Sequence, residues 1–230
     1  MADPVLLLHG LARSERSMRP LARALRAHGF APHLVDYPSR QHRIGPLVDA
    51  ALAPLVERLE AEGAERIHFV THSLGGVLVR AYAARRFDAG DPLPEGSRAV
   101  MIAPPHGGSE VADVVMNVRP IRAYFGPALD ELGTDDASVP LALGPIRGVE
   151  AGVIAGDVNR YPLLGRALPG PGDGSVAVER TRAEGLADWT LVHRTHALIT
   201  FAPDVTDATL RFLEAGRFDD RPFGERETGP

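Results

Sequence analysis

The chain has 230 residues, and its 25 basic residues against 30 acidic residues give a formal net charge of −5 at pH 7. This length allows one large domain or two small ones, and 44% hydrophobic with 24% charged residues is an ordinary globular composition. This mild acidity gives no electrostatic reason to expect nucleic acid or an anionic membrane surface as a partner.

Two missing residue types exclude several kinds of chemistry. The chain contains no Cys, which excludes disulfides, thiolate metal sites and a Cys nucleophile. It also contains no Lys, because every basic residue is Arg. Schiff-base catalysis, a Ser-Lys dyad and the phosphate-binding lysine of a P-loop are therefore excluded as well.

The beginning of the sequence has no pattern of a targeting segment. Only four consecutive apolar residues, Val5 to Leu8, precede His9 and Gly10. A signal peptide needs a positive flank and an apolar stretch of roughly 7–15 residues, and a membrane span needs about 20. We therefore expect a cytoplasmic protein without a transmembrane segment.

Short apolar runs alternate along the chain with longer amphipathic segments. Strands are expected at residues 5–8, 33–36, 67–70, 99–102, 149–155 and 189–192, and helices at 14–28, 47–62, 74–86 and 204–215. Ser14 is expected to cap the first helix, Gly29 and Gly63 to end the first two, and Pro54 to kink the second. This alternation predicts an α/β protein, with a doubly wound, mostly parallel sheet covered by helices on both faces.

The domain organisation is expected to be simple. No internal repeat or linker divides the chain, so we predict a single domain over residues 1–230, ending in a loose tail from 217 to 230. Two segments interrupt the strand–helix alternation: residues 107–148 contain helical, partly apolar pieces, and residues 156–174 form a long Gly/Pro loop. Loops longer than about 12–15 residues are usually functional or disordered, so both are expected near a site.

The clearest chemical signal lies between Ile67 and Val77, where an apolar strand reaches Ser73 and a helix begins immediately afterwards. A nucleophile on such a turn projects its hydroxyl above the sheet edge, and small neighbours are needed because strand and helix nearly touch. Compared with the pattern G-x-S-x-G, Thr71 replaces the first glycine, so the match is imperfect. The alternative is a Ser that caps an ordinary helix, but the preceding strand and the following Gly75 and Gly76 favour a nucleophile.

Five segments together resemble the α/β-hydrolase superfamily, in particular its small bacterial esterases and lipases, over nearly the whole chain. They are His9-Gly10-Leu11 after the first strand, Thr71 to Gly76 at the turn, the Pro-rich stretch Ala103 to Ser109, Gly172 to Val176, and His196 between the last strand and the last helix. The resemblance implies an α/β-hydrolase fold with a short helical cap insertion. The order Ser, Asp, His along the chain is also the order of that family.

The resemblance implies a role for each matching residue. Ser73 would be the nucleophile, His196 the general base that takes its proton, and Asp173 the acid that holds one imidazole nitrogen. The backbone N–H groups of Leu11 and Leu74 would form the oxyanion hole, which stabilises the negative charge that develops during attack. No metal or organic cofactor is implied.

Other residues are weaker candidates for the same roles. His193 lies three residues before His196, and Asp157 follows the fifth expected strand closely enough to replace Asp173 as the acid. His9 and His72 are interpreted as structural residues that orient loops. His106 with Glu110 or Asp113 has a spacing that a metal site would also allow, and Ser109 is interpreted as a helix cap rather than a second nucleophile.

The segment between Glu110 and Leu143 has apolar residues at roughly helical intervals. These residues are Val111, Val114, Val115, Val118, Ile121, Tyr124, Phe125 and Leu129. One interpretation is a helix packed on the core, and the other is a short cap that lines an acyl-chain cleft above Ser73. The two interpretations are compatible.

The sequence therefore predicts a serine carboxylester hydrolase that cleaves small-molecule esters with short- to medium-length apolar acyl chains through an acyl-enzyme. A thioesterase or amidase with the same triad is the alternative within enzymes, because Ser/His/Asp geometry does not identify the leaving group. A catalytically idle relative that binds an apolar ligand is the alternative from another class. The oligomeric state is left open.

Overall fold

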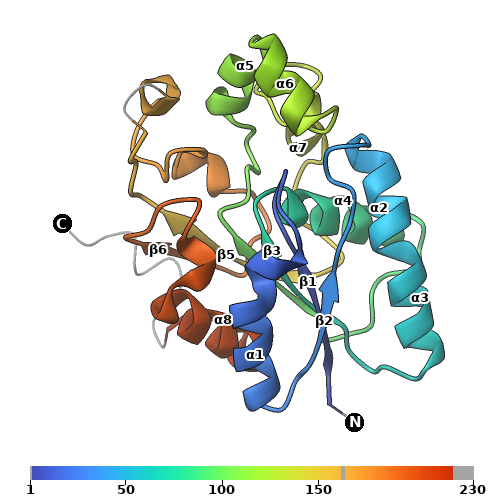
Figure 1. Cartoon of the computed structure of the whole chain (residues 1–230). Helices are drawn as coiled ribbons and strands as arrows, with labels where there is room; N and C mark the ends of the chain where they lie inside the picture. The colour runs from blue at the N-terminus through green and yellow to red at the C-terminus, as the bar shows by residue number, and fades with distance from the viewer. Residues whose placement is uncertain (1, 162–163, 220–230) are drawn as a thin grey trace.

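The computed structural model describes residues 2–161 and 164–219 and contains a six-stranded sheet in the order β2-β1-β3-β4-β5-β6 (Figure 1). All five strand pairings are parallel. The strands are β1 (Pro4–Leu8), β2 (Ala31–Val35), β3 (His68–His72), β4 (Arg98–Ile102), β5 (Glu150–Gly156) and β6 (Asp188–Val192). The predicted class, an α/β protein with a mostly parallel sheet, is confirmed.

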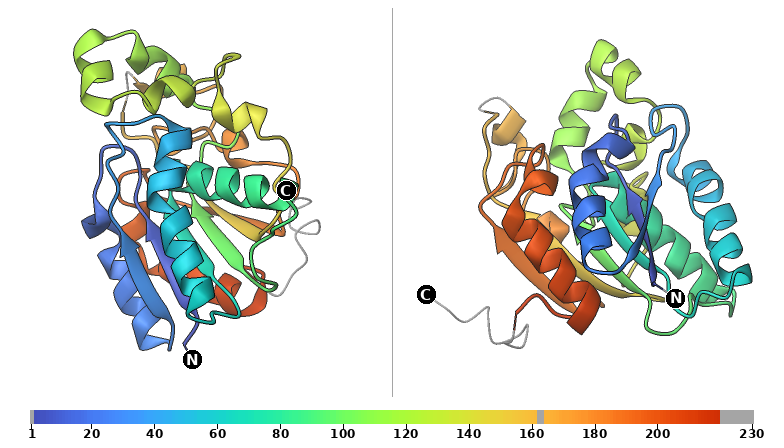
Figure 2. Two further views of the ribbon diagram at one scale, coloured as in Figure 1. Left: turned by 90° about the vertical axis from the view of Figure 1, so that its right-hand side faces the viewer. Right: turned by 60° about the horizontal axis from the view of Figure 1, so that its bottom comes forward.

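Helices cover both faces of this sheet (Figure 2). They are α1 (Arg19–Ala27), α2 (Ile44–Ala51), α3 (Ala53–Ala61), α4 (Leu74–Asp88), α5 (Glu110–Met116), α6 (Arg119–Phe125), α7 (Val139–Ala142) and α8 (Pro203–Ala215), with 3-10 turns at Glu15–Met18, Leu129–Glu131, Leu164–Ala167, Glu179–Thr181 and Ile199–Phe201. Helices α1 and α8 pack on one face, and α2, α3 and α4 pack on the other.

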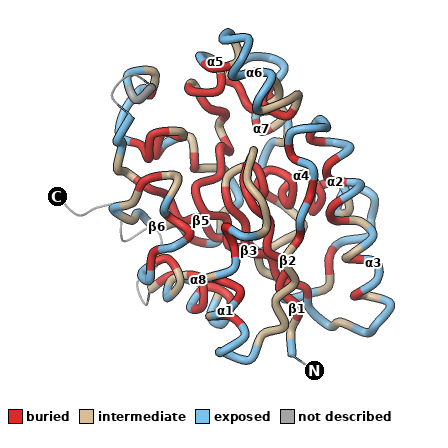
Figure 3. The backbone as a smooth tube through the Cα atoms, in the orientation of Figure 1, coloured by how far each residue is buried: buried red, intermediate tan, exposed pale blue. Residues whose placement is uncertain are grey.

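The core follows from the alternation of side chains along each strand. In β1, Leu6 and Leu8 belong to the cluster under α2–α4, whereas Val5 and Leu7 belong to the cluster under α1 and α8. All four side chains are fully buried, and Figure 3 shows the central strands as the most buried part of the chain. A strand buried on both faces is expected to be apolar throughout, as these runs are.

Two expected helices differ from the structure in informative ways. The helix expected from residue 14 begins as a 3-10 turn, and the Ser14 side chain makes no capping hydrogen bond, so that part of the prediction is wrong. The helix expected over 47–62 is divided into α2 and α3 at Leu52, and Pro54 lies in the first turn of α3. Proline is tolerated there because first-turn N–H groups have no partner inside the helix.

The end of the described chain packs more tightly than a loose tail would. Helix α8 ends at Gly216, whose φ of 72° is the left-handed conformation typical of helix ends. Phe218 is buried against Phe212, with ring centroids 4.9 Å apart, and its backbone N–H donates to Asp188 Oδ2 at 2.6 Å. The expected tail therefore begins later than residue 217, and residues 220–230 of that prediction lie outside the described residues.

The segment 107–148 forms helices α5, α6 and α7 beyond the carboxyl edge of the sheet, at the top of Figure 1. Its helical content was expected, but it consists of short separate helices. Both ends of the segment are attached to α4, because the buried Arg80 donates hydrogen bonds to the carbonyl oxygens of His106 and Gly144. Among the described residues, no helix has the length and apolar composition needed to span a membrane.

Candidate active site

Ser73 occupies the sharp turn between β3 and α4. Its φ of 52° and ψ of −119° are unusual for a residue with a side chain, and its N–H donates to Ile102 O at 2.8 Å. Ala12 and Ala103, with φ of 56° and 50°, are the other described non-glycine residues with positive φ, and they follow β1 and β4. Strain of this kind costs on the order of 1–3 kcal/mol per residue and clusters at functional sites, here along one edge of the sheet.

The two glycines after Ser73 are required by close packing. A Cβ atom on Gly75 would lie 2.8 Å from the backbone oxygen of Leu8, and one on Gly76 would lie 3.0 Å from Pro104 Cβ. Thr71 stands where the pattern has glycine, and its side chain fits there because the facing residue, Gly76, has no side chain. A Cβ atom on Gly76 would lie only 3.3 Å from Thr71 Oγ1.

We expect Gly75→Ala to destabilise the protein by about 1–3 kcal/mol, because the new methyl group overpacks against the backbone of β1. The turn would shift with it, and a displacement near 1 Å at a catalytic group can lower the rate about 100-fold. The matched control is Gly45→Ala in α2, where nothing lies within 4 Å of the added Cβ. Urea unfolding and ester turnover should show Gly45→Ala unchanged or slightly stabilised, and equal behaviour of both variants would contradict the packing argument.

Asp173 and His196 form a hydrogen-bonded pair beside this turn. The His196 Nδ1 donates to Asp173 Oδ2 at 2.7 Å, and Asp173 is fully buried. The other carboxylate oxygen, Oδ1, accepts the backbone N–H groups of Ser175 and Val176 at 2.9 and 2.8 Å. Both oxygens of Asp173 are thus occupied, and Nε2 is the imidazole nitrogen left for chemistry.

The two weaker candidates, Asp157 and His193, pair with each other instead. Asp157 Oδ1 lies 2.9 Å from His193 Nδ1, and the His193 side chain is 82% exposed. Neither residue lines the cavity that contains Ser73. The structure therefore groups Asp173 with His196 and places the alternative pair on the surface.

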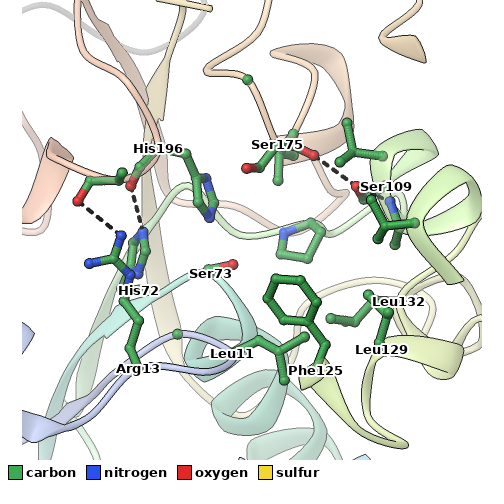
Figure 4. A pocket seen from close by; sticks show the side chains of 18 of the residues that line it. Leu11, Arg13, His72, Ser73, Ser109, Phe125, Leu129, Leu132, Ser175 and His196 are labelled. Carbon is green, nitrogen blue, oxygen red and sulfur yellow. Dashed lines mark hydrogen bonds between the residues drawn. The ribbon is translucent and has the colours of Figure 1, made fainter. Parts of the chain in front are cut away.

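His72 and Arg13 hold the loop that carries His196. The His72 Nε2 donates to His196 O at 3.1 Å, and the Arg13 Nη2 donates to Ala197 O at 3.1 Å, as the dashed lines in Figure 4 show. Burial lowers the pKa of His72 well below its usual value, and the positive charge of nearby Arg13 lowers it further, so His72 is a neutral donor. This agrees with the prediction that His72 orients a loop.

The loop after β1 carries the first predicted oxyanion donor, Leu11. Its neighbour Ala12 donates its N–H to Ser39 Oγ at 3.1 Å, and the imidazole of His9 stacks on Tyr37 with centroids 4.1 Å apart. Leu11 lines the cavity beside Ser73, and Leu74, the second predicted donor, is the first residue of α4. A first-turn N–H has no partner inside its helix. Leu74 itself is fully buried and is not among the residues that line the cavity.

A cavity of about 400 Å³ opens beside Ser73 and His196 (Figure 4). Its apolar wall comes largely from the segment 107–148, through Val111, Ala112, Val115, Ile121, Phe125, Leu129 and Leu132. The interpretation that this segment lines a cleft is therefore correct for five of the eight residues singled out in its sequence. The other three, Val114, Val118 and Tyr124, are exposed.

The remaining candidates have structural partners. Ser109 Oγ accepts the Ala112 N–H at 3.1 Å, which confirms its prediction as a helix cap. Glu110 pairs with Arg180, Asp113 accepts from Thr134, and the buried His106 lies against Arg80. In the part of the chain that the structure describes, no three acidic or histidine side chains form a metal-binding cluster.

A parallel sheet with helices on both faces and a cavity at its carboxyl edge define an α/β protein with a site built from loops. The chain belongs to the alpha/beta hydrolase family, whose model matches residues 5–224. Two triacylglycerol lipases, from Pseudarthrobacter phenanthrenivorans and Burkholderia plantarii, are each 26% identical over 235 residues. Both matches cover 90% of this chain, and they cover 70% and 63% of those relatives.

Solved structures show the same fold at lower identity. The lipase BlEst2 of Bacillus licheniformis has a TM-score of 0.64 at 18% identity, with 92% of this chain and 89% of that chain covered. A metagenomic carboxyl esterase, MGS0156, has a TM-score of 0.67 at 19% identity, covering 94% and 76%. The phospholipase PlaB of Legionella pneumophila has a TM-score of 0.69 at 14% identity, covering 98% and 62%.

Proposed function

We propose that the protein is a serine carboxylester hydrolase in which Ser73, His196 and Asp173 act as a catalytic triad. The observation that carries the proposal is the 2.7 Å hydrogen bond between buried Asp173 and His196, in the same cavity as a Ser held at a strained strand–helix turn. Its triacylglycerol lipase relatives support ester hydrolysis as the reaction.

In the proposed reaction, Ser73 Oγ attacks the ester carbonyl carbon while His196 Nε2 takes the hydroxyl proton. The carbonyl oxygen becomes an oxyanion that accepts hydrogen bonds from the Leu11 and Leu74 amides. His196 then gives the proton to the leaving alcohol, and the acyl group stays on Ser73. A water molecule, activated by His196 in the same way, releases the carboxylic acid and restores Ser73.

Asp173 has a defined task in this scheme. Its hydrogen bond keeps the proton of neutral His196 on Nδ1, which leaves Nε2 as the base, and its charge stabilises the imidazolium that forms. Among the described residues, His196 makes its side-chain hydrogen bond with Asp173 and makes none with Ser73 Oγ. Catalytic hydrogen bonds of this kind often form fully only when substrate binds. His72 and Arg13 donate hydrogen bonds to backbone carbonyls of the His196 loop, which fix the position of that loop in the absence of substrate.

Covalent labelling tests the proposal directly. A fluorophosphonate should add to Ser73, as detected by the mass of the peptide that contains it, and ester turnover should fall in proportion to labelling. A catalytically idle binding protein would gain no adduct. Parallel assays with a butyryl ester, thioester and amide of the same alkyl group would separate carboxylesterase from thioesterase and amidase activity.

For acyl-chain length, we expect kcat/KM for p-nitrophenyl esters to rise by about fourfold per methylene and then fall at medium length. The rise comes from burial of each CH₂ group in the apolar part of the cavity, and the fall comes where that part ends. Soluble esters should be preferred over emulsified long-chain triacylglycerols. A sharp rate increase above the substrate's solubility limit, with long chains favoured, would contradict this expectation.

Two adjacent residues of α6 provide a matched test of the same prediction. Phe125 lines the cavity, whereas Tyr124 is 55% exposed. Phe125→Ala should move the optimum to longer acyl chains because it lengthens the cleft. Tyr124→Ala should leave the optimum where it is.

A further inference from the structure

Arg13 is the one residue with a permanently charged side chain among the described residues that line the cavity. It comes from the loop after β1, and its guanidinium group lies beside His72 and the His196 loop (Figure 4). Phe125, Leu129 and Leu132 lie on the other side of Ser73 in the same view. The cavity therefore has an apolar side and a cationic side, with Ser73 between them.

The hydrogen-bonding capacity of Arg13 is mostly unused. A guanidinium group has five N–H donors, and the single side-chain hydrogen bond described for Arg13 goes to Ala197 O. Within the described part of the chain, no carboxylate lies within 4.0 Å of it, whereas Arg86, for comparison, pairs with both Glu60 and Asp91. Donors without partners at the wall of a cavity are available to a ligand.

The partial burial of Arg13 makes this arrangement unfavourable without an anion. Burial lowers the pKa of Arg13, and the nearby Tyr161 hydroxyl, which also lines the cavity, opposes that shift. A cation that is partly removed from water loses hydration free energy unless an opposite charge approaches it. Arginine also presents a planar pair of donors that fits a phosphate or carboxylate.

The position of Arg13 identifies which part of an ester would meet it. An apolar acyl chain fits the side formed by Phe125, Leu129 and Leu132, so the alcohol part extends toward the other side. His196 must protonate that leaving alcohol, and Arg13 binds the carbonyl of Ala197, the residue directly after His196. The guanidinium group is therefore on the side of the leaving group.

We propose that Arg13 binds an anionic group, a phosphate or a carboxylate, on the alcohol part of the ester substrate. This inference rests on the proposed hydrolysis at Ser73. It makes Arg13 a residue that determines substrate specificity, in addition to its hydrogen bond to the His196 loop.

Two matched pairs of soluble butyryl esters test this inference and distinguish the two anions. One pair is 1-butyrylglycerol and 1-butyrylglycerol 3-phosphate, and the other is 4-carbamoylphenyl butyrate and 4-carboxyphenyl butyrate. In at least one pair, wild-type kcat/KM should be about tenfold higher for the anionic ester, mainly through KM, as for a charge-assisted hydrogen bond. The pair that shows the preference identifies phosphate or carboxylate as the favoured group.

The variants Arg13→Gln and Arg13→Lys test whether the guanidinium group causes the preference for the anionic ester. The anionic-to-neutral ratio of kcat/KM should fall to about one in Arg13→Gln and to an intermediate value in Arg13→Lys. Arg16→Gln is the matched control, because Arg16 is exposed, lies three residues away and does not line the cavity. It should keep the wild-type ratio.

Several outcomes would overturn the inference. A wild-type ratio near one in both pairs, with the neutral esters hydrolysed, would overturn it while the proposed function stands. If Arg13→Gln lowered kcat/KM by the same factor for the anionic and the neutral ester of a pair, Arg13 would only hold the His196 loop. Hydrolysis of none of the four esters would reject the proposed function together with the inference.

A measurement on wild-type protein alone covers the case in which the variants fold poorly. Salt screens attraction between partly exposed charges, with a Debye length of about 10 Å at 0.1 M and about 3 Å at 1 M. The anionic-to-neutral ratio should therefore fall as NaCl is raised across this range. A ratio that does not change with salt would contradict an electrostatic contact with Arg13.

Discussion

Ser73→Ala is expected to lower kcat for ester hydrolysis by about 10⁶-fold, because it removes the oxygen that we propose forms the acyl-enzyme. The fold should tolerate the change. Alanine already adopts a positive φ at Ala12 and Ala103, with values of 56° and 50° that are close to the 52° of Ser73. The free energy of unfolding should therefore stay within about 0.5 kcal/mol of wild type.

The control for this prediction is Ser14→Ala, which deletes a hydroxyl that makes no capping hydrogen bond. It should keep wild-type kcat within about twofold, as expected for a change without a catalytic or structural contact. Retention of more than a few per cent of wild-type kcat by purified Ser73→Ala would remove Ser73 from its proposed role. Loss of the fluorophosphonate adduct in the same variant provides a second, independent readout.

The sheet could be predicted from sequence because its central strands are buried on both faces and therefore appear as uninterrupted apolar runs. The boundary of β2 was less predictable. This strand begins at Ala31 and contains Pro32, which interrupts the apolar pattern. Proline is tolerated there because β2 is an edge strand, and its position at the edge depends on the order of strands in the whole sheet.

The segment 107–148 shows a different limit of sequence patterns. Helical spacing indicated apolar faces, but spacing cannot determine which short helix turns which side chains toward the cavity. The exposed Tyr124 and the cavity-lining Phe125 are neighbours in α6, and their difference depends on how that helix lies over Ser73. The ion pair between Arg122 and Asp130 is likewise set by the folded path of the segment.

The candidate site could be predicted where its residues belong to local motifs, and it could not where distant segments meet. Ser73, Asp173 and His196 each stand in a recognisable short pattern. Arg13 does not, because its contact with Ala197 joins residues 184 positions apart. The pairing of Asp157 with His193 likewise joins residues 36 positions apart, and no local pattern in the sequence indicates it.

Asp173→Asn is expected to lower kcat by about 10³–10⁴-fold through the tautomer of His196. The asparagine oxygen can still accept the backbone N–H groups of Ser175 and Val176, which now bind Asp173 Oδ1 at 2.9 and 2.8 Å. Its NH₂ group then faces His196 Nδ1, which must become an acceptor. The imidazole proton moves to Nε2, and the ring can no longer take the proton of Ser73.

The matched control is Asp157→Asn, which makes the same chemical change in the exposed pair with His193. Because surface ion pairs contribute little and this one lies outside the cavity, kcat should change by less than about threefold. Steady-state kinetics of both variants on one soluble ester are sufficient for the comparison. A large loss in Asp157→Asn together with a small loss in Asp173→Asn would assign the acid to Asp157, because only the residue that fixes the His196 tautomer can produce the larger effect.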